Sequence, residues 1–200
     1  MNALLDSPAK AAALGLVLAT FALVAWLLTG LVDPRGLISV VLRFVHVVSA
    51  MSWVGLIVFV NFIQLRALQE ADDASRSAIS KWIVPRVATV LRHTSHLTVL
   101  SGVLLLVATG YLFSGWVFSS AVYMPEPRAF MLALGALGGV LMWGSLNFVI
   151  WPTLKVVLGH TATDAQAQAR ARQTVKRYAR LNLVLALPVT FIMVAAAHLS

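Results

Sequence analysis

The chain has 200 residues, of which 60% are hydrophobic and only 11% are charged, and its mean hydropathy is +0.89. Soluble domains are about 45–50% apolar, so this composition excludes a soluble globular or disordered protein and makes the lipid bilayer the expected surroundings. The net charge of +8 excludes little by itself, but the basic residues lie mostly at the ends of apolar runs. That placement excludes a purely nucleic-acid-binding role and is typical of membrane orientation signals.

Five apolar segments follow one another along the chain. Each is close to or above the roughly 20 residues that a helix needs to cross about 30 Å of hydrocarbon, where every backbone polar group must bond within its own segment. The segments are residues 11–32, 37–64, 87–118, 129–158 and 181–199. The sequence therefore predicts an all-α integral membrane protein with a single transmembrane domain over residues 1–200. Five helices cross the membrane, and the second to fifth form an antiparallel bundle.

The connections between these segments predict the orientation of the chain. Residues 33–36 and 119–127 contain Gly or Pro and are expected to turn. Residues 65–86 are polar, and residues 159–180 are rich in Ala, Gln and Arg, so the latter are expected to extend the fifth helix beyond the membrane. Twelve of the 15 Lys and Arg residues then lie on the side of the N-terminus, and the other three are Arg35, Arg43 and Arg128. This bias predicts a bacterial inner-membrane protein with a cytoplasmic N-terminus and a periplasmic C-terminus.

The chain has no cysteine. This excludes disulfides, iron–sulfur clusters, thiolate zinc sites and a covalently attached c-type haem, and it leaves histidine as the expected ligand of any redox centre. Four of the five histidines fall in or at the edge of predicted spanning helices, while His160 falls in a connection. Ionisable side chains inside membranes are usually functional, although a single histidine can also serve only to bond a neighbouring helix.

His46 and His198 are the candidate ligands of a haem iron. They lie near the same side of the membrane on helices expected to run in opposite directions, so both imidazoles could hold one b-type haem within the bundle. Arg43 is one turn before His46 and could pair with a haem propionate, or it could extend to the interface as an ordinary basic residue. Trp53 belongs to a polar and aromatic stripe with His46 that is expected to face the bundle interior and the cofactor.

His93 and His96 form a second candidate site beside Arg92. Their spacing of three residues places them on one helix face, so they cannot be the two axial ligands of one haem. One of them could bind a second haem, or the pair could bind a quinone or a metal, or transfer protons.

Four stretches of the sequence resemble the membrane domain at the N-terminus of the cytochrome-c-linked urate oxidase family and its short stand-alone relatives. They are residues 46–64, 84–102, 147–155 and 180–199, and the resemblance covers about residues 40–199. The more specific parts are the His46-x6-Trp53-x-Gly55 pattern and the Ile150-Trp151-Pro152 triplet. The resemblance implies a multi-helix inner-membrane protein associated with respiratory electron transfer, and His46 and His198 fall on positions of the family pattern.

This chain departs from the family in two respects. The larger relatives end in a c-type cytochrome domain, which a chain without cysteine does not carry, and the family more often has an aromatic and an apolar residue at the positions of His93 and His96. The leading hypothesis is a b-type haem membrane protein that exchanges electrons with a separate periplasmic cytochrome c or a larger respiratory complex. The alternatives are a membrane oxidase of urate or another small molecule, with a site lined by Arg92, His93 and His96, and a haem-free structural or assembly subunit of a membrane complex.

Overall fold

The computed structural model describes residues 6–34, 36–112, 127–159, 161 and 164–198. Within these ranges the regular structure is entirely helical, with no β-strand, and five helical spans are long and apolar enough to cross a membrane. The predicted all-helical class and the five apolar spans are therefore confirmed. The spans are Pro8–Leu28, Leu37–Glu70, Asp73–Ala108, Arg128–Val157 and Ala165–His198.

The chain divides into two compact units, residues 1–41 and residues 42–200. The first unit contains helix α2 (Pro8–Leu28), which starts with proline in its first turn, where the missing N–H costs nothing. It ends at Leu28, four residues before residue 32, where the sequence predicts the end of the first span. Gly30 adopts a φ of +74°, and the Gly30 and Val32 amides donate to the carbonyls of Leu27 and Trp26. This glycine-based cap stops the helix although the apolar sequence continues.

The second and third spans each consist of more than one helical segment. Helix α3 (Leu37–Phe59) continues through a π-helical segment, η1 (Val60–Gln64), into the short helix α4 (Leu65–Glu70). Helix α5 (Asp73–Trp82) follows, with Asp72 as its N-cap, and leads into α6 (Val84–Ala108). The connection over residues 65–86 is thus largely helical. The sequence predicts the third span over residues 87–118. Helix α6 starts three residues before residue 87 and ends ten residues before residue 118, and residues 113–118 of the predicted span lie outside the described residues.

The last two spans include a second π-helical segment and one long helix. Helix α8 (Pro127–Gly144) continues through η2 (Ser145–Ile150) into α9 (Trp151–Val157). Pro152 follows η2 and has no N–H to donate, which favours a change of hydrogen-bond register at this point. Helix α10 (Ala165–His198) has 34 residues, so the polar stretch before residue 181 is helical, in line with the extension predicted for the fifth helix.

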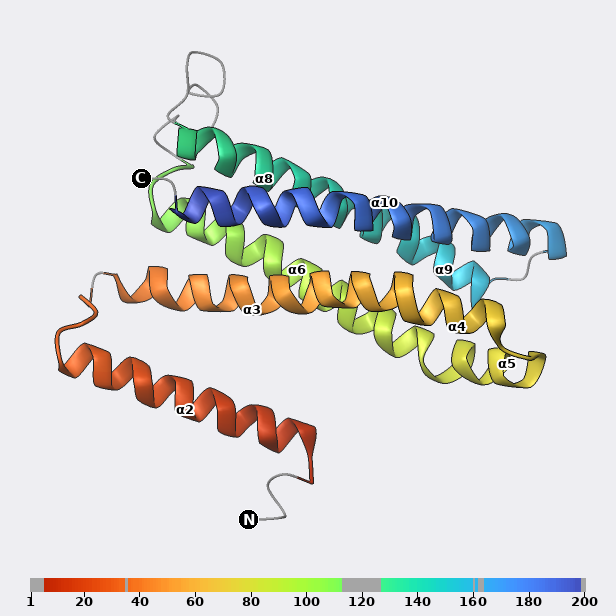
Figure 1. Cartoon of the computed structure of the whole chain (residues 1–200), viewed down its shortest axis with the longest axis horizontal. Coiled ribbons are helices and arrows are strands. Elements are labelled where there is room, and N and C mark those ends of the chain that lie inside the picture. The colour runs from red at the N-terminus through yellow and green to blue at the C-terminus, as the bar shows by residue number, and fades with distance from the viewer. Residues whose placement is uncertain (1–5, 35, 113–126, 160, 162–163, 199–200) are drawn as a thin grey trace. The chain divides into compact units, whose positions relative to one another are not determined.

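The core of the second unit lies where α3, α6, α8, η2 and α10 meet (Figure 1). Small residues let α8 and α10 approach closely. A Cβ at Gly135 would lie 2.9 Å from Met193 Cε, and one at Gly138 would overlap Val189 Cγ2. The buried core residues are Trp53, Ile57, Leu91, Met142, Leu146, Ile150 and Ala186.

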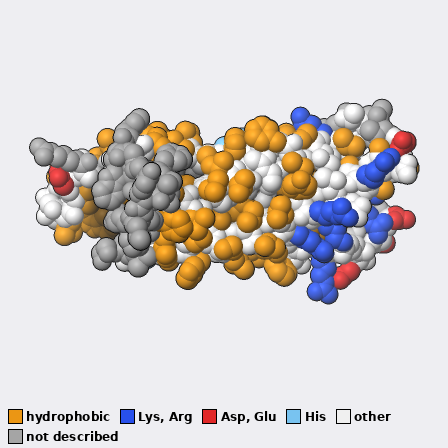
Figure 2. Space-filling model, turned by 90° about the horizontal axis from the view of Figure 1, so that it is seen from above, with side chains coloured by type: hydrophobic (Ala, Val, Ile, Leu, Met, Phe, Trp, Pro, Cys, Tyr) orange, Lys and Arg blue, Asp and Glu red, His pale blue; other side chains and the backbone are white. Residues whose placement is uncertain are grey.

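The outer surface of the second unit is apolar over its middle. Large side chains such as Phe148, Val184 and Phe191 are about 70% exposed, which suits contact with lipid chains and not with water. On the face seen in Figure 2, hydrophobic side chains cover the middle, and Lys and Arg gather toward one end. This arrangement supports contact with a lipid bilayer.

Candidate functional site

His46 on α3 is held by a hydrogen bond to the backbone of α6. Its Nδ1 lies 2.9 Å from the Thr98 carbonyl oxygen, which can only accept, so Nδ1 carries the proton and donates. Ser101 Oγ lies 3.3 Å from the same nitrogen and directs its own proton to the Leu97 carbonyl at 2.6 Å. The neutral imidazole therefore has its lone pair on Nε2, which is the atom a metal-ligating histidine offers when Nδ1 is fixed in this way.

Gly102 on α6 makes room for the His46 ring. A Cβ at this position would lie 3.0 Å from His46 Cε1 and 3.3 Å from Nδ1, closer than side-chain carbons normally approach. Next to the ring, Thr98 Oγ1 donates to Ser49 Oγ at 3.0 Å, and both residues are buried. His46, Ser49, Thr98 and Ser101 thus form a polar seam between α3 and α6, which also explains why these residue types occur inside an apolar span.

Trp53 lies on the same face of α3 as His46, two turns further along the helix. It is 3% exposed, and its indole Nε1–H has no hydrogen-bond partner among the described residues. Toward the end of the span, Asn61 Oδ1 and the 7% exposed Gln64 Oε1 are buried without a partner as well. Unpaired buried polar atoms are rare in proteins and are costly, so this stripe is suited to a polar ligand or ordered water.

His198 and Arg43 lie at exposed positions. His198 ends α10, and its Nδ1 lies 2.8 Å from the carbonyl oxygen of Val194 on the same helix, so its Nε2 is again the free nitrogen. Arg43 is exposed one turn before His46. In the described part of the chain, no hydrogen bond or ring contact joins His46 to His198.

Arg92 links α6 to the second π-helical region. Its Nε donates to Asn147 Oδ1 in η2 at 3.2 Å, and its guanidinium carbon lies 4.6 Å from the centre of the Trp151 ring, a cation–π distance. Lys155 Nζ lies 5.9 Å from the same ring. Trp151 therefore has two cations beside it at the basic end of the spans.

The two histidines next to Arg92 have opposite proton positions. Trp143 Nε1 donates to His96 Nδ1 at 2.7 Å, so a neutral His96 carries its proton on Nε2. His93 Nδ1 lies 2.7 Å from the Thr89 carbonyl and must donate to it, which leaves its lone pair on Nε2. Both side chains are exposed. Arg92, His93 and His96 lie together near the middle of α6 and not at its end, whereas His160 lies outside the described residues.

Both π-helical segments contain an asparagine that binds another helix. Asn61 Nδ2 donates to the Ile57 carbonyl four residues earlier and to the Ala179 carbonyl of α10. Asn147 Nδ2 donates to the Trp143 carbonyl, also four residues earlier, while its Oδ1 accepts from Arg92. In each segment the asparagine amide donates to the carbonyl four residues earlier, which a backbone N–H would bind in a regular α-helix. The wider π-helical turn at this point lets the same asparagine side chain reach a neighbouring helix.

Sequence reasoning did not find the partners of these histidines. Thr98, Ser101 and Gly102 were not singled out, and neither was the contact between Trp143 and His96. A signal for the first set exists, because Ser95, Thr98 and Ser101 recur every three residues in an apolar helix, which indicates a small and polar face. The tryptophan contact has no comparable signal in the sequence.

An axial haem ligand requires an imidazole nitrogen that is free and oriented, and His46 meets this requirement through Nε2. No three His, Cys, Asp or Glu residues come together as a metal-binding group in the described ranges. The fold and these contacts define a helical membrane protein with polar side chains inside its second unit. Comparison of the chain with known protein families, curated proteins and solved structures gave no match.

Proposed function

We propose that this chain is a b-type haem membrane protein that takes part in electron transfer, in which His46 would hold the haem iron. The observation that carries the proposal is the hydrogen bond from His46 Nδ1 to the Thr98 carbonyl. It fixes the ring and leaves Nε2 as the ligand nitrogen. Bound haem would supply an iron that alternates between two oxidation states, and the chain would hold it in a low-dielectric environment.

Other residues support the same proposal. The unpaired Trp53 Nε1–H offers a donor on the face of α3 that carries His46. His198 also has its Nδ1 bound to a carbonyl, so its Nε2 is available as the second ligand. The contact between Asn61 and Ala179 marks a common level along the two helices that carry His46 and His198. Counted from that level along each helix, His198 lies at least about one turn further than His46. The role of His198 therefore needs its own test.

The family resemblance and the charge distribution complete the proposal. The resemblance to the membrane domain of cytochrome-c-linked urate oxidases favours a bacterial inner-membrane protein that serves respiratory electron transfer. The bias of basic residues favours a cytoplasmic N-terminus, and successive membrane crossings would make the bundle antiparallel. A separate periplasmic cytochrome c or a larger respiratory complex would then exchange electrons with a haem near the periplasmic face.

The decisive experiment is a pyridine-haemochrome assay with protein quantitation on the full chain, expressed with added haem. We expect a b-type spectrum at about one haem per chain in the wild type. The His46→Asn variant should lose it, because Asn Nδ2 can replace the donor to Thr98 but offers no ligand lone pair. Ser52→Asn, at an exposed position of the same helix, is the control and should keep the spectrum. A wild type without a b-type band, or full haem content in His46→Asn, would refute the proposal.

The same variants distinguish the haem-free alternative, in which His46 only bonds α3 to α6. In that case the wild type would contain no haem, and His46→Asn would fold with the same stability. His198→Ala tests the second ligand separately. A loss of haem or a shifted spectrum is expected, and an unchanged spectrum would exclude His198 while leaving His46 in place.

A small-molecule oxidase is the second candidate function. It is favoured by Arg92 and His96, which lie one turn apart on α6, since a neutral His96 presents an Nε2–H. Two donors one turn apart on the same helix suit an anionic, carbonyl-rich substrate such as urate. Reduction of the bound haem on addition of urate, abolished in Arg92→Met, would support this candidate, and an absence of reduction would reject it.

A further inference from the structure

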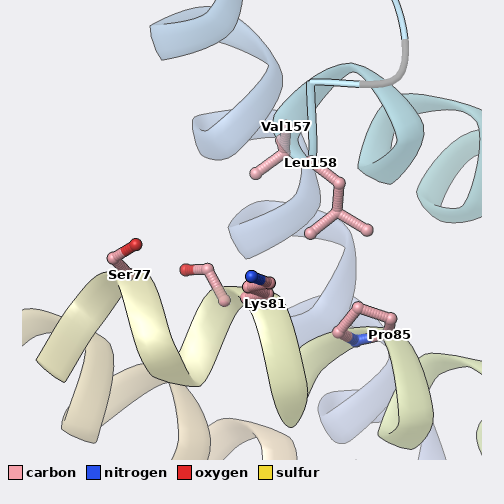
Figure 3. Close-up of a pocket in the computed structure, with 6 residues that line it drawn as sticks. Ser77, Lys81, Pro85, Val157 and Leu158 are labelled. Carbon is pink, nitrogen blue, oxygen red and sulfur yellow. The ribbon is translucent and has the colours of Figure 1, made fainter.

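A polar cavity lies at the basic end of the second unit, away from His46. Its volume is about 310 Å³, and it is lined by Ser77, Ser80, Lys81, Pro85, Val157 and Leu158. Figure 3 shows Ser77, Lys81 and Pro85 on one side of the space and Val157 and Leu158 on the other. The cavity therefore separates α5 and the start of α6 from the end of α9, with polar groups on one wall and carbon on the other.

The polar wall offers hydrogen-bond donors that the protein itself does not use. In the described residues, neither Ser77 nor Ser80 forms a hydrogen bond through its hydroxyl. Other helical hydroxyls, such as those of Thr89 and Thr94, instead donate to carbonyls four residues earlier. Two free hydroxyls one turn apart on α5 thus face the same space.

The charge next to these hydroxyls is positive and is not neutralised. All three acidic residues of the 65–86 connection are engaged elsewhere: Glu70 pairs with Arg66, Asp73 pairs with Arg76, and Asp72 caps α5. Lys81 and Arg86 form no ion pair within the described residues, and their cationic groups lie 5.1 and 5.3 Å from the centre of the Trp82 ring. The cavity wall is therefore suited to an anion.

The surroundings of the cavity are those of a membrane interface. Trp82 and Trp151 each have two cations beside their rings, and tryptophan and basic residues both concentrate at the level of the lipid headgroups. Val157 and Leu158 form an apolar wall at this depth, and the Pro85 ring adds carbon beside Lys81 on the opposite wall. An occupant must then be an anion with a hydrocarbon part, which describes an anionic phospholipid better than a free ion.

We propose that this cavity binds the headgroup of an anionic phospholipid. The ammonium group of Lys81 pairs with the phosphate, the Ser77 and Ser80 hydroxyls donate to its oxygens, and Pro85, Val157 and Leu158 contact the first carbons of the acyl chains. The proposal uses none of the residues assigned to haem, so an experiment that rejects the lipid site leaves the haem proposal untouched, and the reverse also holds.

Native mass spectrometry of the full chain in detergent tests the proposal, with phosphatidylglycerol, phosphatidylcholine and inorganic phosphate as three separate probes. We expect a specific phosphatidylglycerol adduct that is roughly fivefold weaker in Lys81→Gln, because one basic residue at a membrane surface contributes about that factor. A similar weakening is expected in the Ser77→Ala/Ser80→Ala double variant. Arg177→Gln removes an exposed charge from α10 outside the cavity and should bind like the wild type.

Each other outcome overturns the proposal. Equal weakening in Lys81→Gln and Arg177→Gln would mean general surface attraction without a site. Equal binding of phosphatidylcholine would remove the requirement for an anionic lipid, and equal binding of inorganic phosphate would identify a free-anion site. The substituted side chains are exposed or half-buried, so the variants are expected to fold. If Lys81→Gln did not fold, the serine double variant, which keeps all charges, would still test the proposal.

Discussion

At the scale of single residues, the geometry of His46 depends on the absence of a side chain at Gly102. We expect Gly102→Ala to push the imidazole away from the Thr98 carbonyl, since the new Cβ would lie 3.0 Å from His46 Cε1. Gly139→Ala is the matched control, because a Cβ there has nothing within 4 Å. Both changes gain about 1 kcal/mol in helix propensity, but crowding at Gly102 costs roughly 1–3 kcal/mol.

Unfolding of the two variants in mixed detergent micelles measures this difference. Gly139→Ala should be the more stable of the two by about 1–3 kcal/mol. If haem is bound, only Gly102→Ala should change its spectrum. Equal stability of the two variants would show that the His46 ring does not depend on space above Gly102.

Asp72 provides a pH-dependent contact outside the spans. Its Oδ1 accepts from the backbone N–H of Ser75 at 2.7 Å, and this hydrogen bond, supported by the Ser75 side chain and the charge of Arg76, lowers the pKa of Asp72 from its ordinary value of 3.8. Because the pKa is lower in the folded chain than in the unfolded one, the cap stabilises α5 above pH 3.8 and is lost as the pH falls through the lower, folded value.

An NMR titration of the Ser75 amide in micelles measures that pKa. We expect a single transition with a midpoint below 3.8, and we expect it to vanish in Asp72→Asn, which keeps a capping oxygen but does not titrate. A midpoint at or above 3.8, or the same transition in Asp72→Asn, would contradict the assigned cap.

At the scale of helices, the two π-helical segments are the points where neighbouring spans are joined. Arg92 and Asn147 connect α6 to η2, so we expect their substitutions to be coupled. A double-mutant cycle with Arg92→Met and Asn147→Leu should give a coupling of about 1 kcal/mol, near the range found for hydrogen bonds between membrane helices. The free energy of unfolding in micelles is the measurement.

A second cycle provides the control for this coupling. Within the described residues Arg92 forms no hydrogen bond with Asn182, whose Oδ1 instead accepts from Ser145 Oγ at 2.7 Å. Arg92→Met and Asn182→Leu should therefore be additive within about 0.5 kcal/mol. A coupling near zero in the first cycle, or equal couplings in both, would mean that the contact between Arg92 and Asn147 does not stabilise the helix pair.

At the scale of the whole molecule, the distribution of basic residues predicts the orientation of the chain in the membrane. The natural chain has no cysteine, so single-cysteine variants can be labelled without background. In intact cells we expect a membrane-impermeant maleimide to label Ser120→Cys. Ala74→Cys and Gln173→Cys should react only after permeabilisation, because the basic connections are retained in the cytoplasm. The reverse pattern would invert the proposed orientation and place the cavity of Lys81 at the periplasmic face.

The sequence by itself determined the class of the protein, the number of apolar spans and the end at which basic residues gather. These properties follow from segment length and hydrophobicity, which act on each helix alone. Helix ends were less predictable. The Gly30 cap shortens α2 within an apolar run, and the Asp72 cap starts a helix inside a connection expected to be polar.

Only the tertiary structure decided which side chains meet. It joined His46 to Thr98, Trp143 to His96 and Arg92 to Asn147, and it left the hydroxyls of Ser77 and Ser80 facing a shared cavity. The physical reason is that a shift of one residue rotates a helix face by about 100°, so these contacts depend on how packing sets the rotation and register of each helix. Composition and spacing along a single helix carry no information about that choice.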